Sequence, residues 1–268
     1  MGKSIGIISL KGGVGKTSSV VSLGAAIASL NQKVLLVDGN FSAPNLGMHL
    51  KLIDPKYVLN QVLEGVENIS KVIQSLGVFD VLPAAIFGKK VSNPFKLKDK
   101  LKTIKDNYDF VLIDSSPALN DETLATMLAS DEIFVVTTPD YPTLSMTIKA
   151  INLAKQRGTK IDGLILNKVY GGDFELSLKE IEAATEVPVL AVIPHDEDVL
   201  EAVSNFTPYT LHKPNSEGSK EYFKLAEMLS GKRSVPSFWK NFFRFIIPKQ
   251  EVNRDLFYTR MIMDPVGQ

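Results

Sequence analysis

A glycine-rich loop near the amino terminus carries the residue types that hold a phosphate. Residues 10–17 read Leu-Lys-Gly-Gly-Val-Gly-Lys-Thr; the last three match the end of the phosphate-loop pattern G-x-x-x-x-G-K-[ST], whereas Leu10 stands at its first glycine. Closely spaced glycines let main-chain N–H groups turn inward around an anion. Lys16 would supply charge for the β- and γ-phosphates, and the Thr17 hydroxyl is a hard ligand for Mg²⁺. The loop therefore predicts a nucleoside triphosphate site with Mg²⁺.

Two apolar segments farther along the chain end in aspartate. Residues 34–38 read Val-Leu-Leu-Val-Asp, and residues 110–114 read Phe-Val-Leu-Ile-Asp. If both are strands beside the phosphate loop, Asp38 and Asp114 can hold the water shell of Mg²⁺. Each alone could equally be a turn-forming aspartate after a strand. The neighbouring loop favours the metal function.

Short apolar runs alternate with helical segments along most of the chain. The expected strands are Ile5–Ser9, Val34–Asp38, Asp80–Pro83, Phe110–Asp114, Ile133–Thr137, Gly163–Asn167 and Val187–Ile193. The expected helices are Lys16–Leu30, Pro94–Lys105, Asn120–Leu128, Thr143–Arg157, Phe174–Ala183, Asp196–Ser204 and Ser219–Leu229. Continuous apolar strands separated by helices are typical of a parallel sheet covered on both faces. We expect an α/β fold with a doubly wound, mostly parallel sheet, which binds ligands at the carboxyl ends of its strands.

The composition excludes several kinds of protein. The 268 residues include 30 Lys and Arg against 30 Asp and Glu, and this zero net charge argues against a surface coated in positive charge for nucleic acid. The chain has no cysteine, which excludes disulfides, thiol catalysis and thiolate metal clusters. It has neither a signal-sequence pattern nor an apolar run of the roughly 18–20 residues that span a bilayer. We expect a cytoplasmic protein.

The extra lysine in the loop, Lys11, gives the pattern K-G-G-x-G-K-[ST], which resembles the deviant phosphate loop of the MinD/ParA family of P-loop ATPases, and that of MinD above all. The resemblance covers residues 1–231, a single ATPase domain in which residues 38–47 look like switch I and residues 114–118 like switch II. It implies a homodimer with ATP, in which Lys11 reaches the nucleotide of the second copy. The ATP-binding residues that it implies are Lys11, Gly12, Gly13, Val14, Gly15, Lys16, Thr17, Ser18, Asn167, Lys168, Pro194, His195 and Asp196. The metal ligands that it implies are Thr17, Asp38 and Asp114.

One switch I residue departs from the family pattern. The resemblance implies catalytic functions for Lys11, Lys16, Asp38 and the residue at position 40, but that residue is Asn40 where the family has a second aspartate. Asparagine cannot take a proton, yet phosphoryl transfer depends mostly on positioning and charge stabilisation. The substitution therefore predicts slow ATP hydrolysis or an ATP-held dimer. Alternatively, Asn40 only hydrogen-bonds to main chain in a turn.

The last 37 residues, 232–268, differ in composition from the rest and form an appendage. Residues 237–247 can form a short amphipathic helix that Ser237 caps and Pro248 ends. Its apolar face holds Phe238, Trp239, Phe242, Phe243, Phe245, Ile246 and Ile247. Aromatic residues beside basic charge suit a membrane interface, and MinD proteins carry such a helix. The alternative is a helix packed on the core or on a partner subunit.

The sequence leaves three functions open. The first is a MinD-like ATPase that docks on a membrane surface or on a regulatory protein. The second is a ParA-like segregation ATPase whose ATP dimer binds DNA, against which the zero net charge and the aromatic tail argue. The third is a scaffold that binds ATP without hydrolysing it, which Asn40 favours.

Overall fold

One sheet forms the centre of the molecule. The structure is a computed structural model and describes residues 2–87 and 91–231, within which eight strands lie in the order β3-β4-β2-β5-β1-β6-β7-β8. The strands are β1 (Lys3–Ile8), β2 (Val34–Gly39), β3 (Gln74–Ser75), β4 (Asp80–Leu82), β5 (Phe110–Ser115), β6 (Glu132–Thr137), β7 (Gly163–Val169) and β8 (Val189–Pro194). Neighbouring strands pair parallel, except that β3 pairs antiparallel with β4. The doubly wound, mostly parallel sheet is confirmed.

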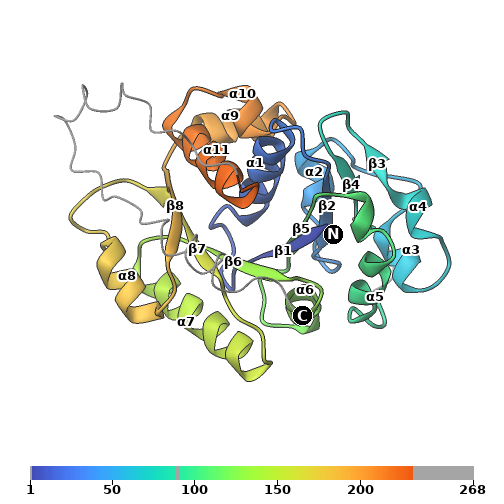
Figure 1. The fold of residues 1–268 in the computed structure, drawn as a ribbon, viewed down its shortest axis with the longest axis horizontal. Coiled ribbons are helices and arrows are strands. Elements are labelled where there is room, and N and C mark those ends of the chain that lie inside the picture. Colours follow the sequence, from blue (N-terminus) through green and yellow to red (C-terminus); the bar gives the residue numbers. More distant parts are fainter. Residues whose placement is uncertain (1, 88–90, 232–268) are drawn as a thin grey trace.

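Helices cover both faces of the sheet (Figure 1). α1 and α11 pack together on one face, and α6, α7 and α8 lie on the other. The helical segments are α1 (Lys16–Ala28), α2 (Leu46–His49), α3 (Leu59–Leu63), α4 (Ile69–Val72), α5 (Lys96–Lys102), the 3₁₀ turn η1 (Lys105–Asn107), α6 (Asp121–Leu128), α7 (Tyr141–Gln156), α8 (Leu178–Thr185), α9 (Asp198–Ser204), α10 (Tyr209–His212) and α11 (Glu217–Leu229). Among the described residues, no helix combines the length and the apolar character of a membrane span.

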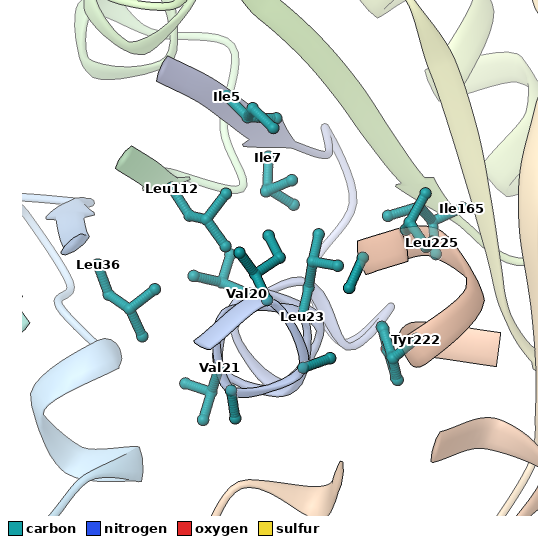
Figure 2. Close-up of a cluster of buried hydrophobic side chains, with 14 of the residues drawn as sticks. Ile5, Ile7, Val20, Val21, Leu23, Leu36, Leu112, Ile165, Tyr222 and Leu225 are labelled. Carbon is teal, nitrogen blue, oxygen red and sulfur yellow. The ribbon is translucent and has the colours of Figure 1, made fainter. Parts of the chain in front are cut away.

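The central strands are mostly apolar because both of their faces are buried. Successive side chains of β1 point to opposite sides, so Ile7 joins the core beneath α1 while Ile8 joins the core beneath α7. Figure 2 shows Val20 and Leu23 of α1 at the centre of the first core, between Leu112 of β5 on one side and Leu225 of α11 on the other. The helix that follows the glycine-rich loop is thus fixed by packing on the sheet.

The expected elements differ from the observed ones mainly at their ends. The helix expected over Phe174–Ala183 begins instead at Leu178, because Ser177 caps it: the Glu180 carboxylate accepts hydrogen bonds from the Ser177 N–H over 2.8 Å and from its hydroxyl over 2.7 Å. β3 and the short helices α2, α3, α4 and α10 were not expected, since elements of two to five residues are too short to show a period. The predicted appendage, residues 232–268 with its helix 237–247, lies outside the described residues.

Candidate nucleotide-binding site

The glycine-rich loop opens into a cavity of about 430 Å³ at the carboxyl end of β1. β1 lies between β5 and β6, and the chain order of the strands reverses there, which is where open α/β sheets bind ligands. Every residue predicted to bind the nucleotide lines this cavity, from Lys11 to Ser18 in the loop, through Asn167 and Lys168, to Pro194, His195 and Asp196. The structure therefore brings three segments that are distant in the sequence to one site.

The loop geometry suits an anion. Gly13 and Gly15 have positive φ angles of 79° and 88°, which glycine adopts without strain. Gly15 is also the N-cap of α1, so no side chain caps this helix, and its first turn contains no acidic residue. A Cβ on Gly15 would lie 2.2 Å from the Asn167 amide, so only glycine fits. The helix thus presents uncapped N–H groups and its positive dipole end to the cavity, an arrangement that fits a phosphate chain.

Lys16, Thr17 and Asp114 form one buried cluster beneath the loop. Lys16 Nζ lies 2.5 Å from Asp114 Oδ1 and also donates to the Ser115 carbonyl, while Thr17 Oγ1 donates to Asp114 Oδ2 over 2.6 Å. The side chains of Lys16 and Asp114 are 8% and 1% exposed. A cation for phosphate oxygens therefore lies beside a hydroxyl and a carboxylate, which are the hard oxygen donors that Mg²⁺ prefers.

Asp38 lies directly opposite Asp114 on the neighbouring strand, in register between β2 and β5. It is fully buried, and its two oxygens accept main-chain hydrogen bonds from Asn40 and from Leu46, each over 3.1 Å. Burial, followed by the nearby charge of Asp114, raises the pKa of Asp38 to about 8. Neither aspartate lines the cavity itself, because both lie at the strand ends below it. A bound cation would offset the repulsion between the two carboxylates.

Asn40 turns its amide in a defined direction. Its Nδ2 donates to the Ala43 carbonyl, which fixes the amide so that Oδ1 is the free end. That oxygen is buried and, within the described residues, has no hydrogen-bond partner. Asn40 lines the nucleotide cavity, and its amide oxygen is a buried acceptor without a partner beside that cavity. The alternative, in which Asn40 only hydrogen-bonds to main chain in a turn, explains the contact of Nδ2. It does not explain why Oδ1 is buried without a partner.

Lys11 is engaged within its own chain. Its Nζ lies 2.5 Å from the Thr143 hydroxyl and 3.3 Å from Asp140 Oδ1. Asp140 is the N-cap of α7 and accepts the Thr143 N–H over 2.9 Å. Burial would raise the pKa of Asp140, but hydrogen bonds from Thr138, Thr143 and Lys11 outweigh it and lower the pKa to about 2. Lys11 is thus held at the rim of the cavity by the start of α7.

The residues expected beside the base line the same cavity. Asn167 Nδ2 donates to the Val14 carbonyl over 2.7 Å, which joins the end of β7 to the glycine-rich loop. His195 stacks on Tyr170 with ring centroids 4.4 Å apart and an interplanar angle of 23°. Asp196 accepts a hydrogen bond from the Tyr209 hydroxyl. His195, Asp196 and Tyr209 thus add aromatic and polar groups to the lining of the cavity, which suit a flat heterocycle.

Sequence reasoning missed residues whose importance depends on tertiary contacts. Tyr209 and Tyr222 line the cavity from the second half of the chain, and the Tyr222 hydroxyl lies 2.8 Å from Ser19 Oγ of α1. Asp140 and Thr143 could have been found from their local pattern, because an aspartate three residues before a threonine, with Pro142 between them, is typical of a capped helix start. No such local signal marks Tyr222.

Comparison with known proteins gives concordant results. The family model described as an AAA domain matches residues 2–162. The cell division ATPase MinD of Pyrococcus furiosus is 36% identical, with a TM-score of 0.81 over 86% of this chain and 99% of that one. The septum site-determining protein MinD of Pyrococcus horikoshii, solved with Mg-ADP, is 33% identical, with a TM-score of 0.80 over 85% and 95% of the two chains. The chromosome partitioning protein ParA of Caulobacter vibrioides is 32% identical over 256 residues, 85% of this chain and 94% of the relative.

Proposed function

Because the chain belongs to the MinD/ParA family of P-loop ATPases, we propose that it is a MinD-type switch whose ATP-bound dimer docks on a membrane or a partner protein. It is an ATPase, and its ligands are ATP and Mg²⁺. The observation that carries the proposal is the cavity of about 430 Å³ that the glycine-rich loop, residues 167–168 and residues 194–196 line together. A phosphate cradle and aromatic groups that line one cavity suit the phosphates and the base of a nucleotide.

Each residue of the buried cluster has a function in this scheme. Lys16 and the N–H groups of residues 12–18 hold the β- and γ-phosphates, and Thr17, Asp38 and Asp114 hold Mg²⁺ directly or through water. When bound, Mg²⁺ neutralises charge on the phosphate oxygens. The unpartnered Oδ1 of Asn40 would accept a hydrogen bond from the attacking water and orient it. An amide accepts no proton, so the proposed hydrolysis is slow.

Dimerisation would control docking. Lys11 leaves Asp140 and Thr143 and reaches the nucleotide of the second copy. Two chains then present two copies of the segment 237–247, whose residues Phe238, Trp239, Phe242, Phe243, Phe245 and Ile246 enter the lipid interface. Each basic residue near an anionic leaflet contributes about 1 kcal/mol, so one such helix binds weakly, whereas two on one dimer gain about 10²–10⁴-fold by effective concentration.

In this scheme the protein is cytoplasmic and becomes peripheral at the inner face of the cell membrane when ATP is bound. A regulatory protein would trigger its release.

Flotation with anionic liposomes tests this function. The full chain should float with ATP and stay in the lower fraction with ADP, and the same samples should be dimeric with ATP by light scattering. Nucleotide binding is measured in parallel. A chain that binds ATP and dimerises but never floats would contradict the membrane function and favour a protein partner.

A ParA-like function is the second candidate, since the Caulobacter ParA is 32% identical to this chain. In that case the ATP dimer would bind DNA without sequence preference. Its affinity would fall steeply with salt, because displaced counterions dominate such binding. A DNA-binding titration between low and physiological salt discriminates the two functions.

A further inference from the structure

Glu122 is a buried carboxylate that the functions above leave unused. It lies in the first turn of α6 with 5% of its surface exposed. Its Oε1 accepts a hydrogen bond from the Ser42 hydroxyl of switch I. Its Oε2 is buried and has no hydrogen-bond partner among residues 2–87 and 91–231. A buried carboxylate with one neutral donor is costly, so this contact between two distant segments needs an explanation.

The first turn of α6 is tied to switch II. Thr123 Oγ1 donates to the Ala118 carbonyl over 2.7 Å and to the Ser116 carbonyl over 3.1 Å. Asn120, the N-cap of α6, donates through Nδ2 to Ser116 Oγ over 3.2 Å. Switch II and the start of α6 therefore form one hydrogen-bonded unit, and Glu122 is part of it.

The same turn contacts the loop that carries Asn40. This loop is closed on itself by the hydrogen bond from Asn40 to the Ala43 carbonyl, and Ser42 within it bonds to Glu122. At the end of β2 the fit is tight, because a Cβ on Gly39 would lie 2.8 Å from both the Thr126 hydroxyl of α6 and the Asp114 carbonyl. Gly39 thus allows the two segments to touch, and the Ser42–Glu122 bond connects the loop itself to the helix.

We propose that Glu122 is a positioning residue that couples switch I to switch II: it holds the loop 40–43 against α6, so that Asn40 keeps its place beside the nucleotide cavity and follows switch II. The inference rests on the proposed function, because the switches matter only if the site distinguishes ATP from ADP. Glu122 touches neither the phosphates nor the metal in this scheme. Its effect passes through Ser42.

The test compares the full chain with Glu122→Ala, Glu122→Gln and Ser42→Ala. In the nucleotide-free protein, amide exchange of residues 40–46 should rise about fivefold in Glu122→Ala and Ser42→Ala, the factor that one lost hydrogen bond of about 1 kcal/mol produces. The ratio of the affinity for a non-hydrolysable ATP analogue to the affinity for ADP should fall by about the same factor. The reason is that only a ligand with a γ-phosphate contacts the switches, so ADP affinity should stay within about twofold. Glu122→Gln keeps Oε1 as an acceptor for Ser42 and should restore both values.

Glu180→Ala is the matched control, because Glu180 also accepts a serine hydroxyl at a helix start, but on α8, away from the nucleotide. It should lower the melting temperature and leave the affinity ratio unchanged. Equal losses of ATP-analogue and ADP affinity in Glu122→Ala would show a merely structural function and overturn the inference. A Ser42→Ala chain whose amide exchange and affinity ratio equal those of the parent would also overturn the inference. Ser42→Ala provides the test if Glu122→Ala fails to fold. A parent chain without nucleotide affinity would instead overturn the proposed function, and the exchange of residues 40–46 would still test the coupling.

Discussion

Lys11 Nζ lies 2.5 Å from the Thr143 hydroxyl, so in the single chain the extra lysine of the loop is bound to the start of α7. If Lys11 acts across a dimer, as we propose, it exchanges this internal partner for an intermolecular one. We expect Lys11→Ala to bind ATP and to stay monomeric with it. Light scattering with ATP measures the outcome, and Lys33→Ala, at an exposed lysine, is the control. A Lys11→Ala chain that dimerises as the parent does would contradict the function across the dimer.

The low pKa of Asp140, about 2, predicts a specific dependence of stability on pH. Because the folded pKa lies below the ordinary value of 3.8, the ionised Asp140 stabilises the fold above about pH 4, and this contribution is lost as the pH falls toward 2. Asp140→Ala removes the N-cap of α7 and should cost about 1 kcal/mol at neutral pH. The difference in free energy of unfolding between parent and variant should shrink below about pH 4. Denaturant titrations at several pH values measure this difference in free energy of unfolding. Asp173→Ala, at an exposed aspartate, is the control. A difference between parent and Asp140→Ala that stays constant down to about pH 2 would refute the prediction.

Asn40→Asp should speed hydrolysis. A carboxylate at this position accepts a proton, and general base catalysis typically contributes about 10²–10⁴-fold. We expect a gain of only about tenfold, below that range, because the new charge lies beside Asp38. The loss of the donor to Ala43 should lower stability by about 1 kcal/mol. Steady-state phosphate release measures the rate, with Asn40→Ala as the variant that loses the acceptor and slows further. Equal or lower release from Asn40→Asp, with ATP binding intact, would remove Asn40 as the cause of slow turnover.

Lys16→Ala should abolish ATP binding. It removes the cation of the phosphate cradle and leaves the buried Asp114 with the Thr17 hydroxyl, and loss of one partner of a buried pair typically costs about 3–5 kcal/mol. Lys16→Gln retains a donor for Asp114 and separates the two effects: it should fold nearly as stably as the parent and still bind ATP at least about a hundredfold more weakly. Calorimetric titration and thermal melting give both values. Tight ATP binding by Lys16→Gln would show that the cradle holds the phosphates without this charge.

Charges on the apolar face of residues 237–247 should prevent membrane binding. The double variant Trp239→Glu/Phe242→Glu places two carboxylates where acyl chains would lie, at a cost of a few kcal/mol each, and should no longer float with anionic liposomes while nucleotide affinity is unchanged. Asn241→Glu puts the same charge on the polar face and should weaken binding by only about tenfold. If the segment packs on the globular domain instead, the double variant should melt at a lower temperature. Unchanged flotation, or lost stability in a chain whose parent never floats, would contradict the membrane function.

Much of the site was predictable because its signals are local. The glycines, Lys16 and Thr17 form one continuous loop between a strand and a helix, and Asp38 and Asp114 each follow a continuous apolar strand. In a parallel sheet such strand ends meet at one edge, so the shared position of these residues followed from the fold class alone. The capped start of α7 is equally local.

The partners of these residues were not predictable from the sequence. Lys11 and Asp140 are 129 positions apart, and Ser42 and Glu122 are 80 apart. Their contacts depend on the angle at which α6 and α7 leave the sheet, and this angle is set by the packing of many side chains at once. The free direction of the Asn40 amide likewise depends on the Ala43 carbonyl, whose orientation no residue type specifies.

The hydrogen bond between Ser19 of α1 and Tyr222 of α11 has a mechanical consequence. α1 begins at the phosphate cradle, α11 ends at Leu229, and the two helices pack side by side in one core. The point at which the chain passes residue 231 is therefore anchored to the same rigid body as the nucleotide. A lever or hinge within α11 would have to break this core, so we expect α11 to stay with α1 when the nucleotide changes and the number of assembled chains to report the nucleotide state.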